Sequence, residues 1–424
     1  MNIHNAKVNI IRAAGVDGRF GTERSGENGR NEKLSKRSAE LSATMAAPRP
    51  KPLKLGTSIQ ASFGDPEDPD YIFEIAVNGQ KSNMAVSLST NAIKLYSPET
   101  GAYVGDCLGH TSTISGISFP DPNSPMLLLS SSADGTIRTW DIRNRKEVAA
   151  IRHPTPGSEI WNFSVGGITN QVAAGGDSQV LIWDWRTRNL MSELDELHTE
   201  AVTQVHYHPA KRELLFTASV DGLINIIDTS QSLKPEDLQY DTLSVGTSIG
   251  KIGFYGRYSQ MLWCLTHIET LSVWDLEEKM QAAEFKETRT NASFKWGLDN
   301  VNYLIDCFSP SGTDDLWLAA GNNDGAMGFF PTSFPKPVHP SVPSLGVFGE
   351  VGCVLEGGHQ GVVRTVWLSQ NLDTEQSLFA WTGGEDGRLC SWSRSGAVEH
   401  GRSWVSNNLV MKKGSSSKTR HSPY

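Results

Sequence analysis

The chain has 424 residues with a formal net charge of −9, and glycine (40) and tryptophan (12) are both abundant. Residues 1–51 and 401–424 each carry a net charge of +5, so residues 52–400 carry −19. A body this acidic is a poor match for nucleic acid, whose binding depends on neutralising phosphates. No apolar stretch approaches the ~18 residues of a membrane span, and the N-terminus lacks the apolar region of a signal peptide. We therefore expect an intracellular protein, in the nucleus or cytoplasm, whose partners are other proteins.

Five cysteines are scattered along the chain, with no CxxC pair and no histidine cluster at metal-ligand spacing (Cys107, Cys264, Cys307, Cys353 and Cys390). Such spacing indicates reduced, buried thiols rather than a disulfide framework or a zinc site. The sequence also lacks a phosphate-binding GxxxxGK[ST] loop, a GxGxxG turn between strand and helix, and a GxSxG elbow. We expect no metal, no cofactor and no small-molecule substrate.

Both ends of the chain have the composition of disordered segments. Residues 1–51 are rich in glycine, serine, asparagine and charged residues without a sustained hydrophobic period, which predicts a disordered basic tail. Met45 is a possible second start site. Residues 405–424 are basic and serine-rich, and we expect them to be disordered too. Lys412-Lys413 with Arg420 is either a thin nuclear-localisation signal or a solvated tail.

The stretch Leu128–Arg143 sets the pattern for the region between the tails. An apolar run ends in an Asp134-Gly135 turn, and a second run alternates small or polar with apolar residues before closing on Trp140-Asp141. An Asp-Gly turn flanked by β-branched residues predicts a β-hairpin. Gly109-His110 lies upstream.

The same spacing recurs seven times, with an apolar or aromatic residue six positions after each turn: Tyr96, Trp140, Trp183, Ile227, Trp274, Phe330 and Trp392. Most steps are 43 to 47 residues, and the last two are longer. A period near 40–45 with Gly-His, Asp-Gly and Trp-Asp is typical of WD-repeat propeller blades. We predict an all-β, seven-bladed WD-repeat β-propeller over residues 52–404.

Two segments complete the predicted ring. A strand over Leu53–Ala61 can form the outer strand of the last blade and close the ring, because an open edge strand invites mispairing. Residues 330–347 contain five prolines. Proline removes ladder donors, so we expect a surface loop there.

Three blades repeat histidine, a hydroxyl residue and aspartate at matching offsets: His110, Ser130 and Asp134; His198, Thr217 and Asp221; His359, Thr382 and Asp386. One copy could suggest a catalytic triad. Three copies favour a structural role, and the likeness to WD-repeat proteins implies a buried chain from aspartate through histidine and hydroxyl to a tryptophan indole. Trp140 and Trp392 complete two of these sets, while Ile227 stands in the third. We expect no enzyme.

Two Trp-Asp-x-Arg boxes follow consecutive blades, ending at Arg143 and Arg186. They resemble the box of WD-repeat substrate receptors of cullin-4 ubiquitin ligases. That resemblance implies that both arginines face the ligase adaptor. The alternative is that each is a solvated arginine after a strand, since a lone exposed charge contributes little.

A second candidate surface is the rim that carries the turns. Likeness to the heterotrimeric G-protein β subunit implies that nine positions, most of them small or weakly polar, face a partner: Thr113, Ser115 and Ala133; Ala201, Thr203 and Val220; Val362, Arg364 and Glu385. None of the nine is aromatic, the residue class that is enriched among binding hot spots.

Three stretches resemble the WD repeat-containing protein 89 family: residues 262–276, 357–364 and 382–386. The last residues, Arg420–Tyr424, resemble its plant members. That resemblance implies an intracellular seven-bladed protein and names no reaction or ligand. We expect a non-catalytic protein-interaction scaffold, monomeric within a complex. The alternative is a substrate receptor of a cullin-4 ligase.

Overall fold

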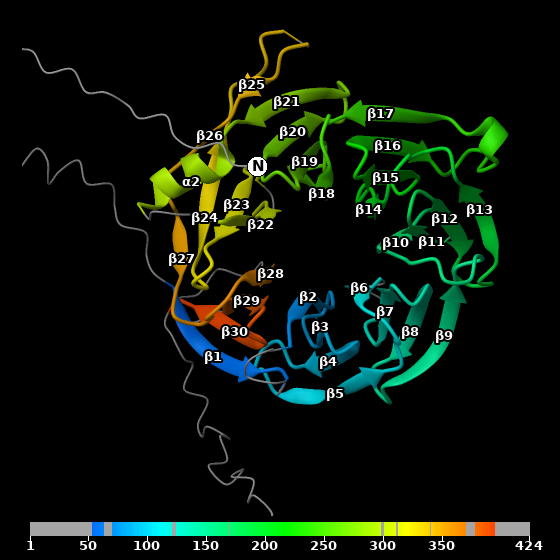
Figure 1. Cartoon of the computed structure of the whole chain (residues 1–424), viewed down its shortest axis with the longest axis horizontal. Helices are drawn as coiled ribbons and strands as arrows, with labels where there is room; N and C mark the ends of the chain where they lie inside the picture. The colour runs from blue at the N-terminus through cyan, green and yellow to red at the C-terminus, as the bar shows by residue number, and fades with distance from the viewer. Residues whose placement is uncertain are drawn as a thin grey trace, which may run out of the picture. The chain divides into compact units, whose positions relative to one another are not determined.

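The computed structural model describes residues 53–62, 70–120, 124–168, 170–297, 301–310, 313–339, 341–369 and 378–394. These residues form seven sheets arranged as blades in a ring, and each blade runs from an inner strand near the centre to an outer strand at the circumference (Figure 1). The predicted seven-bladed all-β propeller is therefore confirmed. The tails expected at residues 1–51 and 405–424, together with residues 395–404, lie outside the described residues.

The first three blades are four-stranded antiparallel sheets whose chain order equals their spatial order. Blade one consists of β2 (Ile72–Val77), β3 (Met84–Leu88), β4 (Ala92–Tyr96) and β5 (Tyr103–Leu108). Blade two consists of β6 (Ile114–Ser118), β7 (Leu127–Ser132), β8 (Thr136–Asp141) and β9 (Lys146–Arg152). Blade three consists of β10 (Asn162–Gly166), β11 (Gln171–Gly175), β12 (Val180–Asp184) and β13 (Leu190–Leu194).

The next three blades follow the same plan, with additions in the last two. Blade four consists of β14 (Val202–Tyr207), β15 (Leu214–Ser219), β16 (Leu223–Asp228) and β17 (Tyr240–Ser244), with a 3₁₀ turn, η1 (Pro235–Asp237). Blade five consists of β18 (Ile249–Tyr255), β19 (Met261–Thr266), β20 (Leu271–Asp275), β21 (Met280–Phe285) and the short β25 (Ser344–Leu345). Blade six consists of β22 (Tyr303–Phe308), β23 (Trp317–Gly321), β24 (Met327–Ser333), β26 (Val347–Phe348) and β27 (Cys353–Leu355).

Blade seven joins the two ends of the propeller. It consists of β28 (Val363–Leu368), β29 (Leu378–Gly384), β30 (Arg388–Ser393) and β1 (Lys54–Gln60). β1 pairs antiparallel with β30, from Lys54 opposite Ser393 to Gln60 opposite Arg388. The predicted closing strand is confirmed, and it gives β30 a partner along its outer edge, which would otherwise be open to mispairing.

The hydrophobic core is divided among the seven interfaces between neighbouring blades. Seven clusters of buried residues are present, and each joins two adjacent sheets. For example, Leu95 of blade one packs with Ile117 and Trp140 of blade two. A central strand of a blade is thus covered on both faces, which explains why all five residues of β3 and of β11 are buried.

Polar contacts also cross every interface, close to the centre of the ring. At each one, a side chain of an inner strand hydrogen-bonds to the backbone of the next blade: Thr365 to Ile75, Glu74 to Ile117, Ser115 to Ile160, Asn162 to Val205, Thr203 to Ile249, Lys251 to Ile305, and Tyr303 to Val363. These bonds fix neighbouring blades to each other and satisfy backbone groups at the inner strands.

Blades five and six carry the longest insertions. Helix α2 (Thr288–Trp296) connects them, and the Trp296 ring packs edge-on against Phe330 at 5.9 Å. The expected proline-rich surface loop at 330–347 is only partly correct, because β24 extends through Pro331 and short strands follow it. Pro331 lies opposite Trp317 of β23, and its carbonyl accepts from the Gly349 N–H at 2.8 Å, while Thr332 and Ser333 pair with β26.

Candidate interaction site

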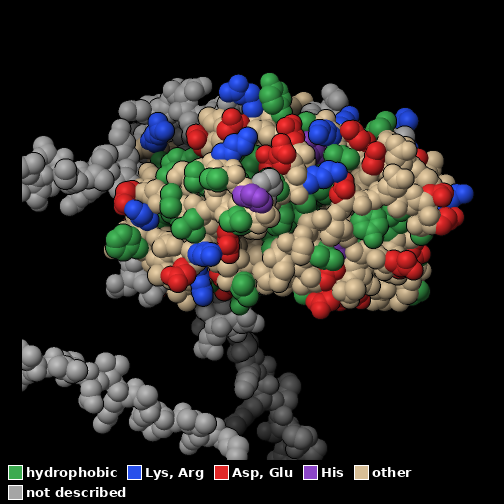
Figure 2. Space-filling view, turned by 90° about the horizontal axis from the view of Figure 1, so that it is seen from above, with side chains coloured by type: hydrophobic (Ala, Val, Ile, Leu, Met, Phe, Trp, Pro, Cys, Tyr) green, Lys and Arg blue, Asp and Glu red, His purple; other side chains and the backbone are tan. Residues whose placement is uncertain are grey.

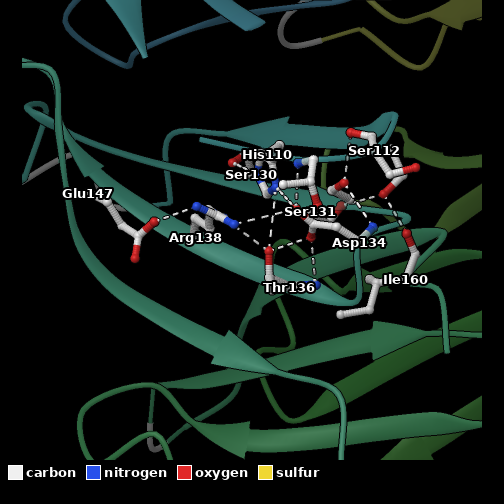
Figure 3. A network of polar contacts seen from close by, with 12 residues as sticks. His110, Ser112, Ser130, Ser131, Asp134, Thr136, Arg138, Glu147 and Ile160 are labelled. Atoms are coloured by element: carbon white, nitrogen blue, oxygen red, sulfur yellow. Dashed lines mark hydrogen bonds and ion pairs between the residues drawn. The ribbon is translucent and has the colours of Figure 1, made fainter. Parts of the chain in front are cut away.

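Blade two contains a continuous hydrogen-bonded chain from its tryptophan to its turn aspartate. Figure 3 shows the part of this chain that involves Ser130, His110 and Asp134. Trp140 Nε1 donates to Ser130 Oγ at 2.8 Å, Ser130 Oγ lies 2.7 Å from His110 Nε2, and His110 Nδ1 lies 2.9 Å from Asp134 Oδ2. Burial lowers the pKa of His110, which favours the neutral ring. In that state Ser130 donates to Nε2 and Nδ1–H donates to the carboxylate.

Asp134 is also bound by groups outside this chain. Thr136 Oγ1 and the Thr111 backbone N–H donate to its carboxylate at 2.5 and 3.0 Å. Burial opposes ionisation, but these hydrogen bonds and the one from His110 lower the pKa of Asp134. Arg138 Nη2 lies 3.5 Å from the Asp134 carboxylate, and Arg138 Nη1 lies 2.7 Å from Glu147 Oε2. Because Glu147 belongs to β9, this second ion pair extends the network to the outer strand of the blade (Figure 3).

Blade seven repeats this arrangement. Trp392 Nε1 donates to Thr382 Oγ1 at 2.8 Å, which lies 2.7 Å from His359 Nε2. His359 Nδ1 lies 3.1 and 3.2 Å from the two carboxylate oxygens of Asp386. Burial alone would lower the pKa of His359, but the hydrogen bond to Asp386 raises it to about 9. A protonated ring fits this geometry, because the Thr382 hydroxyl donates to the Cys390 carbonyl at 3.5 Å and is therefore free to accept from His359 Nε2.

Blade four keeps the chain without the indole. His198 Nδ1 lies 3.0 Å from Asp221, and Nε2 lies 2.9 Å from Thr217. The buried Ile227 occupies the tryptophan position. Asn225 supplies the polar contact instead, since its Nδ2 donates to the Leu197 carbonyl at 2.7 Å and lies 3.3 Å from His198 Nε2. The sequence spacing did not single out Asn225.

Blade three does not form the network. Its second strand, β11, has Ala173 where β7 of blade two has Ser130, and His153 Nε2 is buried without a hydrogen-bond partner among the described residues. Asp177 accepts from the exposed Trp161 indole at 3.2 Å rather than from a histidine. The turn aspartate of this blade therefore supports a surface aromatic and not the blade interior.

These networks have no arrangement suited to nucleophilic chemistry. The three hydroxyl residues Ser130, Thr217 and Thr382 are each 0% exposed. A nucleophile must reach a substrate and lie beside an oxyanion site. Hydroxyls that are enclosed in the sheet and bonded on both sides stabilise the blade instead.

The two Trp-Asp-x-Arg arginines follow the ends of β8 and β12, and therefore lie on the face opposite the Asp-Gly turns. Arg143 forms a two-pronged ion pair with Asp141, with Nη2–Oδ2 at 2.6 Å and Nε–Oδ1 at 2.9 Å, yet its side chain is 71% exposed. Arg186 is exposed, and its backbone N–H donates to Asp184 at 2.8 Å. Asp141 thus holds the Arg143 guanidinium in a fixed orientation at the surface.

The turn-bearing rim carries a charged and aromatic group. Arg364 Nη2 lies 2.5 Å from Glu385 Oε1, and its guanidinium carbon lies 5.8 Å from the centre of the Tyr71 ring. Tyr71 contacts Phe73 edge-on at 6.5 Å. None of the nine rim positions that the likeness to the G-protein β subunit implied is aromatic. Tyr71 and Trp161 add aromatic side chains to this rim.

The other rim positions differ in their availability. Thr113 is exposed, and its carbonyl accepts from the Ala133 N–H at 2.9 Å. Ser115 is half-buried, and its hydroxyl lies 2.6 Å from the Ile160 carbonyl and 2.8 Å from Ser131. Thr203 makes the corresponding contact between blades four and five. Ala201, Val220 and Val362 are partly exposed without a strong recognition group.

The inner strands β2, β18 and β22 carry three charged side chains, Glu74, Lys251 and Asp306. The charges of Lys251 and Asp306 both affect the pKa of Glu74. Glu74 accepts from the Ile117 N–H at 2.9 Å, and Lys251 Nζ lies 3.5 Å from Asp306. Burial raises the pKa of Glu74 to about 7, against the opposing effects of the Ile117 hydrogen bond and of Lys251. Among the described residues, no group of three or more His, Cys, Asp or Glu side chains could hold a metal ion.

Seven sheets in a ring, with His–Ser/Thr–Trp networks in blades two and seven, define a WD-repeat β-propeller. Residues 101–141 match the family model described as WD domain, G-beta repeat. The chain is 44% identical over 391 residues to the WD repeat-containing protein GTS1 of Arabidopsis thaliana, which covers 91% of this chain and 96% of that protein. It is 27% identical over 338 residues to the WD repeat-containing protein 89 homolog of Dictyostelium discoideum, which covers 80% and 86%. The chain belongs to this family of WD repeat-containing proteins, as its sequence motifs predicted.

A more distant relative shares only part of the ring. The human GATOR2 complex protein WDR59 is 32% identical over 138 residues, which cover 32% of this chain and 14% of that protein. WD-repeat propellers are generally protein-interaction scaffolds and are typically non-catalytic. Among the described residues, no helix is long and apolar enough to cross a membrane.

Proposed function

We propose that this protein is a non-catalytic scaffold that binds other proteins on the two faces of its propeller, and that the turn-bearing rim is one docking surface. The observation that carries the proposal is the exposed Arg364, held between Glu385 and the Tyr71 ring. Arginine and tyrosine are the residue types most enriched in binding hot spots. Thr113, Ser115 and Ala133 continue this rim on blade two.

A second candidate is a substrate receptor of a cullin-4 ligase, which would dock the adaptor on the opposite face. It is favoured by Arg143, whose guanidinium is exposed yet fixed by Asp141. Arg186 occupies the same position in the next blade. A guanidinium that is already oriented loses less side-chain entropy on binding than a free one.

Affinity purification with mass spectrometry tests both candidates, with wild-type protein beside two double variants. Arg364→Ala/Glu385→Ala should lose partners if the rim docks them, while Arg143→Ala/Arg186→Ala should keep them. Adaptor and cullin peptides that are present with wild type and absent with the second variant would instead establish the ligase receptor. An unchanged partner set with both variants would contradict both assignments.

A further inference from the structure

The proline-rich segment forms an arm, residues 334–339 and 341–343, that projects from the outer side of blades five and six. Pro340 lies outside the described residues. Both ends of the arm are fixed to the ring, because Ser333 pairs with β26 while Ser344 and Leu345 pair with β21. Figure 1 shows this loop extending outward beyond β25. Neither docking surface proposed above includes it.

Two prolines determine the backbone of the first limb of the arm. Proline holds its own φ at about −65°, and it restricts the preceding residue to an extended conformation. Pro335 and Pro337 therefore constrain four consecutive residues, from Phe334 to Pro337, which belong to neither a strand nor a helix. This constraint favours a polyproline II helix, which repeats every three residues and has no internal hydrogen bonds.

The exposure of this limb repeats with the same period. Every third residue is half-buried and the two residues that follow it are exposed: Phe334 and Pro337 against Pro335, Lys336, Val338 and His339. Residues that are three apart lie on the same edge of a polyproline II helix. One edge of the limb therefore faces the protein, and two edges face solvent.

The limb is held in place at its base and at its tip. The Phe334 ring lies edge-on to Phe285 at 6.4 Å and packs against the buried cluster between blades five and six. At the tip, the Val342 N–H donates to the His339 carbonyl at 3.1 Å, and Ser341 Oγ lies 2.7 Å from His339 Nδ1. The arm is thus ordered before a partner binds, which lowers the entropic cost of binding.

The two outer edges of the limb differ in chemistry. Pro335 and Val338 form an apolar edge, and the Val338 side chain is fully exposed. Lys336 places an exposed positive charge on the other edge. Because the two prolines lack N–H groups, they cannot donate to a strand of a partner. Recognition of this limb therefore depends on packing against its side chains.

Further exposed apolar side chains lie close to the arm in the chain. Val342, Leu345 and Val347 are each more than half exposed. In Figure 2, which looks onto this side of the ring, hydrophobic side chains gather on the left half of the face shown. A partner that covers the arm can therefore extend its apolar contact onto blades five and six.

We propose that this arm is a docking segment for a partner domain that recognises polyproline II helices through an aromatic-lined groove. Proline-rich segments with a preformed helix of this kind bind to such grooves. Aromatic side chains of the groove would pack on Pro335 and Val338, and an acidic side chain beside it would pair with Lys336. The inference rests on the proposed scaffold function and adds a class of partner that neither face of the propeller implies.

The test is binding of the full-length protein to a panel of purified SH3, WW and EVH1 domains, measured by biolayer interferometry. We expect saturable binding to at least one domain. Pro335→Ala/Pro337→Ala should weaken this binding about tenfold or more, because the limb loses its fixed backbone and two apolar contacts. Val338→Asp should weaken it about tenfold, since a carboxylate would enter an apolar groove. Lys336→Ala should weaken it about threefold and reduce its salt dependence.

A second Pro-x-Pro pair provides the matched control. Pro154 and Pro156 have the same spacing as Pro335 and Pro337, and both are exposed in the connection between β9 and β10. Pro154→Ala/Pro156→Ala should bind the domain as wild type does. The fully exposed Val338 makes Val338→Asp a variant that should keep the wild-type Tm, so its loss of binding reports on the arm and not on folding.

Three outcomes would overturn the inference: no binding by any domain when each binds its own control peptide, binding that persists in both Pro335→Ala/Pro337→Ala and Val338→Asp, or an equal loss in the Pro154→Ala/Pro156→Ala control. These outcomes leave the scaffold function standing if Arg364→Ala/Glu385→Ala still loses partners in the purification. Conversely, arm-dependent binding with no partners lost by either surface variant would support the arm and reject the two face assignments.

Discussion

The hydroxyl oxygen of Ser130 lies 2.8 Å from the Trp140 indole nitrogen, ten residues away in the chain, and accepts a hydrogen bond from it inside the blade. The same hydroxyl lies 2.7 Å from His110. The Ser130 hydroxyl thus connects Trp140 of β8, through His110, to the turn residue Asp134. The bond geometry explains why catalytic-looking residues repeat along this chain without forming a catalytic site.

Replacing Asp134 with alanine should destabilise the protein by about 1–3 kcal/mol, because it leaves the buried His110 ring without its acceptor. Denaturant unfolding of wild type and variant measures this difference. Asp177→Ala is the matched control, since Asp177 holds the same turn position in blade three but contacts only the exposed Trp161 side chain. A loss of stability below about 0.5 kcal/mol in Asp134→Ala, no larger than in the control, would contradict the assigned role.

Removal of the closing strand should disrupt the ring. Deletion of residues 1–62 takes away β1, which exposes the outer edge of β30 and should lower Tm and promote association through that edge. Deletion of residues 1–51 leaves β1 in place and should keep the wild-type Tm. Differential scanning fluorimetry and size-exclusion chromatography distinguish the two. Equal behaviour of both truncated proteins would show that β1 does not close the ring in solution.

Stability should fall as pH rises from about 4.5 to about 7, through the titration of Glu74. A carboxyl whose pKa is raised by folding favours the folded state only while it is protonated, so its contribution is full below the unfolded value and lost above the folded one. Glu74→Gln keeps an acceptor for the Ile117 N–H and cannot ionise. The variant should therefore show a flatter Tm–pH profile and a higher Tm than wild type at pH 8. Parallel profiles would refute the prediction.

Tyr303→Phe should weaken the interface between blades six and seven by about 1–3 kcal/mol. The Tyr303 hydroxyl accepts from the Val363 N–H at 2.7 Å and donates to the Asn322 carbonyl at 3.1 Å, so its loss leaves two groups unsatisfied. Burial raises the pKa of Tyr303 to about 12, so the effect should be constant between pH 6 and pH 9. A strong pH dependence in that range would indicate another cause.

Arg143→Ala should change stability by less than about 0.5 kcal/mol, because the Arg143 side chain is 71% exposed and Asp141, whose side chain is 12% exposed, still accepts from the backbone N–H of residue 143. Thermal unfolding of the single variant checks this. The result matters for the adaptor experiment, since a lost partner can be attributed to the surface only if the fold is intact. A large drop in Tm would mean that the Asp141–Arg143 pair stabilises blade two.

The sequence by itself determined the architecture, because propeller blades are local structures. Each turn and its tryptophan position lie six residues apart, so Asp134-Gly135 and Trp140 can be recognised without knowing any distant contact. The His–Ser/Thr–Asp offsets were visible for the same reason. The pairing of the Leu53–Ala61 segment with the last blade is not local, and it was predicted because a ring requires closure.

Only the tertiary structure decided which side chains serve neighbouring blades and which remain free. Ser115 and Thr203 fit the rim pattern in sequence, yet their hydroxyls bond across the blade interfaces. Asn225 supports blade four in place of an indole, and the proline-rich segment adds strands to blades five and six. A cavity of about 430 Å³ is lined by residues between 208 and 241 together with Leu276 and Lys279, and no local spacing predicts a surface that forms where two sheets meet. Contacts between blades depend on the ring, which brings together residues that the sequence pattern treats separately.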